Sequence, residues 1–201
     1  MPMTEEQLRR RLTKAREAQS ALYARGRNSH VELARYIAVA EEVLQAERDL
    51  AAARGDQYAV PLDLGYEPDP GVSNPSLQQD DNSAILRFNA AAKLADGSFG
   101  AHGIAEVSFA VCSITRFGYP NDEALPGHPL YGRGLAAYGI FEVHNSQWDR
   151  VLREQNLVSF PNWQWPSRKH LVFSFHDSTF ECICAAIESS RFTPNPDGDS
   201  S

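Results

Sequence analysis

The sequence lacks a long hydrophobic run, since no stretch approaches the roughly 20 apolar residues that a helix needs to cross a bilayer. Polar residues such as Thr4 and Glu5 stand near the beginning, and no apolar signal core follows them. An excess of positive charge is also missing, because the formal net charge of the 201 residues is −7. We therefore expect a cytoplasmic protein that binds neither nucleic acid nor an anionic membrane.

Cysteine is scarce as well. The chain has three cysteines, Cys112, Cys182 and Cys184, an odd number in a chain long enough to bury a core without disulfide bonds. Free thiols fit a reducing compartment, in line with the expected cytoplasmic location. The sequence also contains no Gly-rich dinucleotide fingerprint, phosphate-binding loop, nucleophile elbow or His-Glu-x-x-His motif. It therefore names no cofactor and leaves open whether the protein is an enzyme.

Residues 4–54 have the pattern of two amphipathic helices. Thr4 with Gln7 forms a capping box before the first helix, and a second box follows a short break. That second box joins Ser29 to Glu32, and the short break predicts an antiparallel helical hairpin. Each helix carries an apolar stripe that must pack on the rest of the chain or on a second copy. The first stripe consists of Leu8, Leu12, Ala15, Ala18 and Leu22. The second consists of Leu33, Ile37, Ala40, Val43 or Leu44, Glu47 and Leu50, with Glu47 as the polar exception.

The segment 55–81 is expected to be a connector without regular elements, because glycines and prolines recur along it. Residues 82–188 have the pattern of a β-rich domain, and residues 189–201 are expected to form a disordered tail. Ser146 caps a short helix that is predicted to run to residue 155. The predicted strands are residues 84–89, 104–117, 138–144, 170–176 and 179–187.

The predicted fold class is α+β. It comprises an N-terminal antiparallel helical hairpin over residues 1–54. A mainly antiparallel sheet or partly closed β-barrel of about five strands follows, with one short helix. Parallel βαβ architecture is disfavoured, because no helix of the usual length separates the predicted strands.

The loop 117–135 carries more functional side chains than a spacer needs. Its glycines and prolines exclude a helix or a central strand, yet it carries carboxylates, an imidazole, two phenols and a guanidinium. We predict that Asp122 or Glu123 orients His128 for acid/base catalysis. The ligand-binding candidates in the same loop are Tyr119, Asn121, Tyr131 and Arg133, the last for an anionic group. The alternative interpretation is a loop of purely structural turns.

The last two predicted strands form a hairpin. A two-residue turn at 177–178 would pair Phe175 with Phe180. Side chains alternate across a strand, so Cys182 and Cys184 would then lie on the apolar face. We interpret both cysteines as core residues and not as zinc ligands, although a Cys-x-Cys pair near histidines is a pattern that zinc can use.

The opposite face of this hairpin is polar. It holds Ser174, His176, Thr179 and Glu181. We take His176 as a further catalytic candidate and Glu181 as a ligand-binding candidate on a pocket wall that faces the loop. A solvated outer face is the alternative, because antiparallel sheets often have one.

A metal site would need about three ligands. The available candidates are Asp122, His128, His144 and His176. Their spacing matches no recognised ligand pattern, so the sequence does not predict a metal site.

Two functions from different classes fit these observations. In the first, the 117–135 loop and the terminal hairpin form a pocket that binds a small polar or anionic molecule, with or without acid/base catalysis. In the second, the chain is a non-enzymatic protein-interaction module that forms a homodimer or docks through its helical hairpin. Trp163 and Trp165 would then anchor contacts, because aromatic residues are favoured at interfaces.

Three motifs carry a resemblance to a known group of proteins. They are Phe117-Gly-Tyr-Pro-Asn-Asp-Glu-Ala124, Gly127-His-Pro-Leu130 and Phe175-His-Asp-Ser-Thr-Phe-Glu-Cys182. In these motifs the chain resembles an uncharacterised family of small bacterial proteins, over about residues 82–187. The resemblance implies no activity, cofactor or partner, and the helical hairpin lies outside it.

Overall fold

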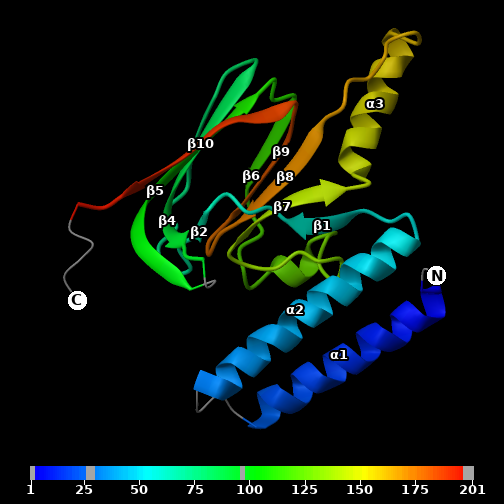
Figure 1. Cartoon of the computed structure of the whole chain (residues 1–201). Coiled ribbons are helices and arrows are strands. Elements are labelled where there is room, and N and C mark those ends of the chain that lie inside the picture. The colour runs from blue at the N-terminus through cyan, green and yellow to red at the C-terminus, as the bar shows by residue number, and fades with distance from the viewer. Residues whose placement is uncertain (1–2, 26–29, 96–97, 197–201) are drawn as a thin grey trace.

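A computed structural model describes residues 3–25, 30–95 and 98–196 of the chain (Figure 1). The α-helices of these residues are α1 (Glu5–Arg25), α2 (His30–Ala53) and α3 (Gln147–Ser159). The first strands are β1 (Tyr58–Pro61), β2 (Tyr66–Pro68), β3 (Ser76–Gln79), β4 (Ser83–Lys93) and β5 (Phe99–Ala110). The later strands are β6 (Ile114–Gly118), β7 (Gly139–His144), β8 (Lys169–Ser174), β9 (Thr179–Cys184) and β10 (Ala186–Pro194).

The strands form two open antiparallel sheets. One has the order β1-β7-β8-β9-β6, and the other has the order β10-β5-β4-β2 with β3 also paired to β4. The predicted α+β class with an antiparallel sheet is therefore confirmed. The expectation of about five strands in one sheet or barrel is wrong, because ten strands in the described residues divide into two sheets that are not closed.

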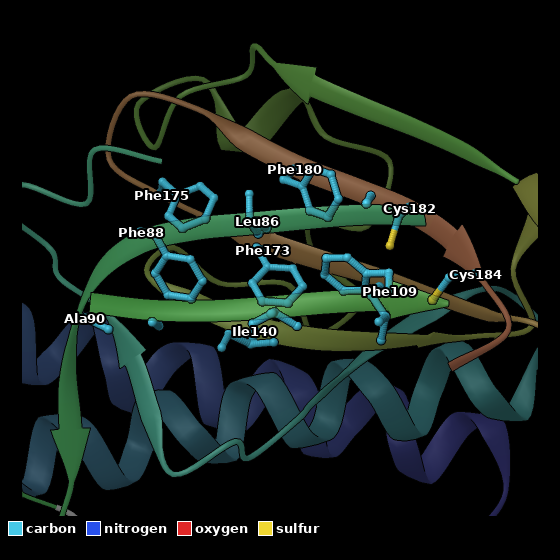
Figure 2. Close-up of a cluster of buried hydrophobic side chains, with 14 of the residues drawn as sticks. Leu86, Phe88, Ala90, Phe109, Ile140, Phe173, Phe175, Phe180, Cys182 and Cys184 are labelled. Atoms are coloured by element: carbon cyan, nitrogen blue, oxygen red, sulfur yellow. The ribbon is translucent and has the colours of Figure 1, made fainter. Parts of the chain in front are cut away.

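The main core lies between the two sheets (Figure 2). Phe88 and Phe109 from one sheet meet Phe173 of the other edge-on, with ring centroids 5.9 and 5.8 Å apart. Cys182 and Cys184 are buried in the same cluster as free thiols. The interpretation of these two residues as core cysteines is therefore confirmed.

The helices α1 and α2 pack against each other beside the sandwich, with α2 next to β1 (Figure 1). The capping box is present, since Gln7 N–H donates to Thr4 Oγ1 at 3.3 Å and Thr4 N–H donates to Gln7 Oε1 at 2.8 Å. The predicted box at Ser29 lies outside the described residues. The buried residues between the two helices are Leu8, Leu12, Ala15, Val43, Ala46 and Leu50. Leu8, Leu12, Ala15, Val43 and Leu50 of the predicted stripes are thus covered within the chain, whereas Ala18, Leu33 and Ile37 are exposed.

The sequence predicted that residues 55–81 contain no regular elements. This prediction is wrong, because β1, β2 and β3 lie within them. Pro61 ends β1 and Pro68 ends β2, and both strands lie at sheet edges, where a missing N–H is tolerated. The predicted start of the disordered tail, at residue 189, was also too early. Residues 186–194 pair with β5 as the edge strand β10, while residues 197–201 lie outside the described residues.

The predicted strand 104–117 is two strands in different sheets. β5 ends at Ala110, and β6 begins at Ile114 in the other sheet. Val111 between them has φ of +48°, a conformation that a β-branched residue rarely adopts. The chain crosses from one sheet to the other at this point, which the uninterrupted apolar pattern did not reveal.

The terminal hairpin has a longer turn than predicted. β8 and β9 pair Phe173 with Phe180, and Phe175 N–H donates to the carbonyl of Ser178 at 2.8 Å. The predicted partner of Phe180 was Phe175, so the register was wrong by two residues. A shift of two residues preserves the alternation of faces, which is why the cysteines still lie in the core. Glu181 consequently lies opposite Val172 instead of Ser174.

Candidate functional site

The loop between β6 and β7 covers the outer face of the β1-β7-β8-β9-β6 sheet. Its apolar side chains pack on that face in a second, smaller core. The members of this core are Ala59, Leu125, Leu130, Leu135, Phe141, Val143 and Val172. Gly134 makes the close approach possible at φ of +93°, because a Cβ there would collide with Ala59 and Arg48. The loop therefore faces the polar side of the terminal hairpin.

This packing brings two histidines onto one carboxylate. His128 Nε2 lies 3.3 Å from Glu181 Oε1, and His170 Nε2 lies 3.2 Å from Glu181 Oε2. All three residues are buried, with 7, 4 and 5% of the surface of His128, His170 and Glu181 exposed. Arg116 Nη1 lies 3.7 Å from Glu181 Oε1 and is the nearest cation. We call Glu181, His128, His170 and Arg116 the Glu181 cluster.

The hydrogen bonds determine how the two imidazoles are oriented. Leu130 N–H donates to His128 Nδ1 at 3.2 Å, so Nε2 of the neutral ring carries the hydrogen that points at Glu181. His170 Nδ1 lies 2.9 Å from Ser146 Oγ, which accepts from Asp149 N–H at 3.0 Å. The Ser146 hydroxyl can therefore donate to His170, whose Nε2 hydrogen also points at Glu181. Both nitrogens of each ring are engaged.

Glu181 is ionised at neutral pH in this arrangement. Burial by itself raises the pKa of Glu181, because it disfavours the charged form. The hydrogen bonds that His128 and His170 donate outweigh burial and lower the pKa of Glu181 to about 2. The cluster thus holds a negative charge in a largely buried position.

A cavity of about 330 Å³ adjoins this cluster. The loop supplies His128, Pro129 and Leu130 to its lining, and the hairpin supplies His170 and Glu181. The start of α3 contributes Gln147 and Trp148, and the remaining lining residues are Gln57 and Arg116. Its size lies within the range of small-molecule sites, and it combines an aromatic wall with a few polar groups.

The predicted partner of His128 was wrong. Asp122 does not orient His128, because it accepts hydrogen bonds from Tyr138 O–H and from His176 Nδ1, the latter at 2.9 Å. Asp122 N–H also donates to the carbonyl of His176 at 3.0 Å. We call Asp122, Tyr138 and His176 the Asp122 cluster. The predicted grouping of His176 with Glu181 is therefore wrong as well, because the loop reaches the hairpin at two separate points.

The Asp122 cluster is more exposed than the Glu181 cluster. The hydrogen bond from Tyr138 lowers the pKa of Asp122, with a further contribution from His176. The Asp122 carboxylate in turn raises the pKa of His176 by hydrogen bonding and by its charge. The same carboxylate raises the pKa of Tyr138 to about 12. His176 Nε2 lies 4.0 Å from Asp177, which is itself exposed.

The other predicted loop residues lie apart from the cavity. Asn121 Oδ1 accepts from Ala124 N–H at 3.1 Å and so stabilises a local turn. Arg133 Nη2 lies 3.9 Å from Asp56. Glu123 and Tyr119 are exposed, and Tyr131 lines a different hollow between the loop and the helices α1 and α2. The purely structural interpretation thus applies to part of the loop.

Sequence reasoning missed His170, Arg116 and Trp148. His170 and Ser174 are separated by an even number of positions on one strand, so their side chains point to the same face. His170 could therefore have been predicted on the polar face of the hairpin. Arg116 pairs with Glu181 across β6 and β9, a neighbourhood that required the sheet order. Trp148 lies in the short helix that Ser146 was predicted to cap, and only the packing of α3 brings it to the cavity.

The metal candidates are dispersed in the structure. His144 stacks on Tyr58 at 5.1 Å between ring centroids, while Asp122 and His128 belong to different clusters. Within the described ranges, no group of three or more His, Cys, Asp and Glu side chains is placed to hold a metal ion. None of the helices in these ranges combines the length and apolar character needed to cross a membrane.

Comparisons of the chain with protein-family models, with curated proteins and with solved structures find no match. The resemblance carried by the loop and hairpin motifs therefore stays a prediction. Any functional conclusion has to come from the geometry of the site.

Proposed function

We propose that the chain binds a small polar molecule in the cavity beside the Glu181 cluster. The ligand would donate hydrogen bonds from an ammonium, amide or hydroxyl group to Glu181. It would pack against Trp148 and place an anionic group, where it has one, on Arg116. The observation that carries the proposal is the Glu181 carboxylate, which two imidazoles hold ionised in the wall of a cavity of about 330 Å³.

Glu181 retains capacity to accept further hydrogen bonds. An ionised carboxylate has about four acceptor positions. Among the described residues, the two imidazoles donate to it directly, and Arg116 lies somewhat farther away at 3.7 Å. A ligand that donates to the remaining positions would bind to an acceptor whose orientation is already set, so little ordering cost would accompany binding.

The geometry supports binding better than acid/base catalysis in this cavity. A general base needs a pKa near the working pH, and the pKa of Glu181 is about 2. His128 and His170 have no free ring nitrogen with which to accept a proton from a ligand. In this proposal the histidines position the carboxylate, and the carboxylate recognises the ligand.

The proposal is tested by nuclear magnetic resonance of the ¹⁵N-labelled full chain. The probes are ethylamine, glycine, acetamide and acetate, each added up to about 10 mM, which detects affinities in the millimolar range. We expect an amine or amide probe to shift the Trp148 indole N–H resonance while the exposed Trp163 indole stays unchanged. If no probe shifts the Trp148 resonance, the proposal is wrong.

A pair of arginine variants provides the matched control. Arg116→Gln removes the cation beside Glu181, whereas Arg87→Gln removes an exposed arginine that pairs with Glu106 in the other sheet. We expect Arg116→Gln to reduce the affinity for glycine, whose carboxylate needs a cation, and to leave ethylamine binding less affected. Equal effects of the two variants on glycine would exclude Arg116 from the site.

The second candidate function is docking through the helical hairpin. Leu33 and Ile37 of the predicted stripe lie one turn apart on α2 and are 42 and 49% exposed. Sedimentation velocity of the wild type and of a Leu33→Lys/Ile37→Lys variant tests this candidate. A wild-type dimer that the variant cannot form would favour docking through the hairpin. A monomer in both cases would exclude a homodimer through this surface.

A further inference from the structure

A second hollow, of about 570 Å³, lies among β7, α3 and the segment before β8. It is separate from the Glu181 cavity, although His170 borders both. The charged residues in its lining are Glu142, Asp149, Arg150, Arg153 and Arg168. The proposed function uses none of these five residues.

The charge balance in this hollow is positive. Glu142 accepts a hydrogen bond from Lys169 Nζ at 2.7 Å, so that carboxylate already has a cationic partner. Asp149 is then the one remaining carboxylate in the described lining, against three guanidinium groups. The whole chain has a net charge of −7, so this concentration of arginines is a local exception.

Two of the arginines have no partner among the residues that the structure describes. Arg150 and Arg153 lie one turn apart on α3, and neither side chain makes a hydrogen bond or ion pair with another described residue. Other helical arginines do have partners. Arg9, for example, donates to Glu5 at 2.7 Å, and Arg10 donates to Glu6 at 2.5 Å. The cations of α3 therefore remain available for a ligand.

The third arginine is held in place. Arg168 Nη1 donates to the carbonyl of Val111 at 3.1 Å, and its guanidinium carbon lies 5.9 Å from the centroid of the Trp165 ring. Trp165 is in turn anchored through its indole N–H, which donates to Asp149 Oδ1 at 3.0 Å. Asp149 is thus engaged with Trp165 while Arg168 has a defined orientation.

We propose that this hollow binds the phosphate group of a small phosphorylated molecule through Arg150, Arg153 and Arg168. Guanidinium groups suit this ligand, because their planar N–H donors match the oxygens of a phosphate and their charge offsets its two negative charges. The hollow is larger than a free phosphate ion and lies within the size range of small-molecule sites. The favoured ligand is therefore a phosphate monoester.

The test is isothermal titration calorimetry of the full chain at constant ionic strength. The probes are glycerol 3-phosphate and inorganic phosphate, with sodium chloride as the reference. We expect glycerol 3-phosphate to bind more tightly than phosphate, and tighter binding of free phosphate would still support the site while changing its ligand. Heats no larger than those of sodium chloride for both probes would overturn the proposal.

Charge-matched variants show whether the binding is local. Arg150→Gln/Arg153→Gln should weaken binding by about tenfold or more, whereas Arg9→Gln/Arg10→Gln removes the same charge from α1 and should change it by less than about twofold. Equal losses in the two variants would mean a general charge effect and would overturn the site. Both pairs are exposed on helices, so the fold should persist, and an unchanged thermal unfolding midpoint checks this.

This proposal and the proposed function fail independently. Arg150 and Arg153 do not line the Glu181 cavity, and Trp148 does not line the hollow beside α3. A loss of phosphate binding in the α3 variant with unchanged probe binding at Trp148 would assign the two ligand classes to two separate sites.

Discussion

The Glu181 and Asp122 clusters compare closely in composition and differ in burial. Each centres on a carboxylate that accepts a hydrogen bond from histidine, and each ties the same loop to the terminal hairpin. The side chains of Glu181 and His128 are 7 and 3% exposed, whereas that of His176 is 46% exposed. Water screens the second cluster more than the first, so similar contacts have different energetic weight.

Burial also changes what each cluster can do. In the Glu181 cluster every imidazole nitrogen is engaged, and the carboxylate is the group with spare bonding capacity. In the Asp122 cluster the carboxylate is shared by Tyr138 and His176, and His176 Nε2 faces an exposed region. The first is suited to holding a ligand, and the second is suited to clamping the loop onto the hairpin turn.

The largest expected effect is that of Glu181→Ala. The substitution leaves two buried imidazoles without their acceptor, so we expect the free energy of unfolding to fall by about 2–4 kcal/mol. Urea denaturation measures it, with Glu123→Ala as the control, because Glu123 is exposed and should change stability by less than about 0.5 kcal/mol. Similar losses in both variants would contradict the expectation that the buried contacts of Glu181 stabilise the fold.

His128→Ala should have the next largest effect. The side chain is almost fully buried, and we expect a loss of about 1–3 kcal/mol in the free energy of unfolding from the missing contacts and hydrogen bonds. His176→Ala is the comparison and should cost clearly less, because its side chain is half exposed. A greater loss in His176→Ala would reverse the order that burial predicts.

Acid should weaken the Glu181 cluster within a defined pH range. The folded-state pKa of Glu181 is about 2, below its ordinary value of 4.5, so its contribution to stability is present above pH 4.5 and is lost as the pH falls toward 2. The stability difference between wild type and Glu181→Gln should therefore shrink by up to about 3 kcal/mol over this range. Urea denaturation from pH 5 down to the acid limit of the fold measures it, and a constant difference would contradict the prediction.

The smallest expected effect is the pH dependence of the Asp122 cluster. The pKa of Asp122 is lowered, so its contribution is lost as the pH falls below the ordinary value of 3.8. The pKa of His176 is raised above 6.5, so its contribution is present below 6.5 and is lost as the pH rises through the raised value. The stability difference between wild type and His176→Gln should thus be largest between these limits. A difference that grows at alkaline pH would have the wrong sign.

Local patterns allowed a good part of the fold to be predicted. The capping box at Thr4 and the cap at Ser146 both mark real helix starts, because capping depends on residues three positions apart. The sequence did not predict β1, β2 and β3 within residues 55–81. Such short strands gain their stability from a partner strand and carry little periodicity of their own. The division of 104–117 into two strands was missed for a related reason, since both parts are apolar.

The sequence pointed to the loop and the hairpin, but it did not predict how their side chains pair. The loop and the hairpin do form the cavity, and His128 and Glu181 both line it. The partner of His128 was assigned to a nearby carboxylate in the same loop, whereas its actual partner lies 53 residues away. Proximity along the chain is a poor guide in a loop that is laid across a sheet, because packing of Leu125, Leu130 and Leu135 decides which way each polar side chain points.

The sequence by itself determined the α+β class and the antiparallel pairing of the two N-terminal helices. It also determined that Cys182 and Cys184 lie on one face of the terminal hairpin and Glu181 on the other. These properties follow from local periodicity, capping and alternation, which a register shift of two residues leaves intact. Only the tertiary structure decided that Glu181 meets His128 and His170 while Asp122 meets His176. The physical reason is that these contacts depend on strand register and loop placement, which are set by packing between distant parts of the chain.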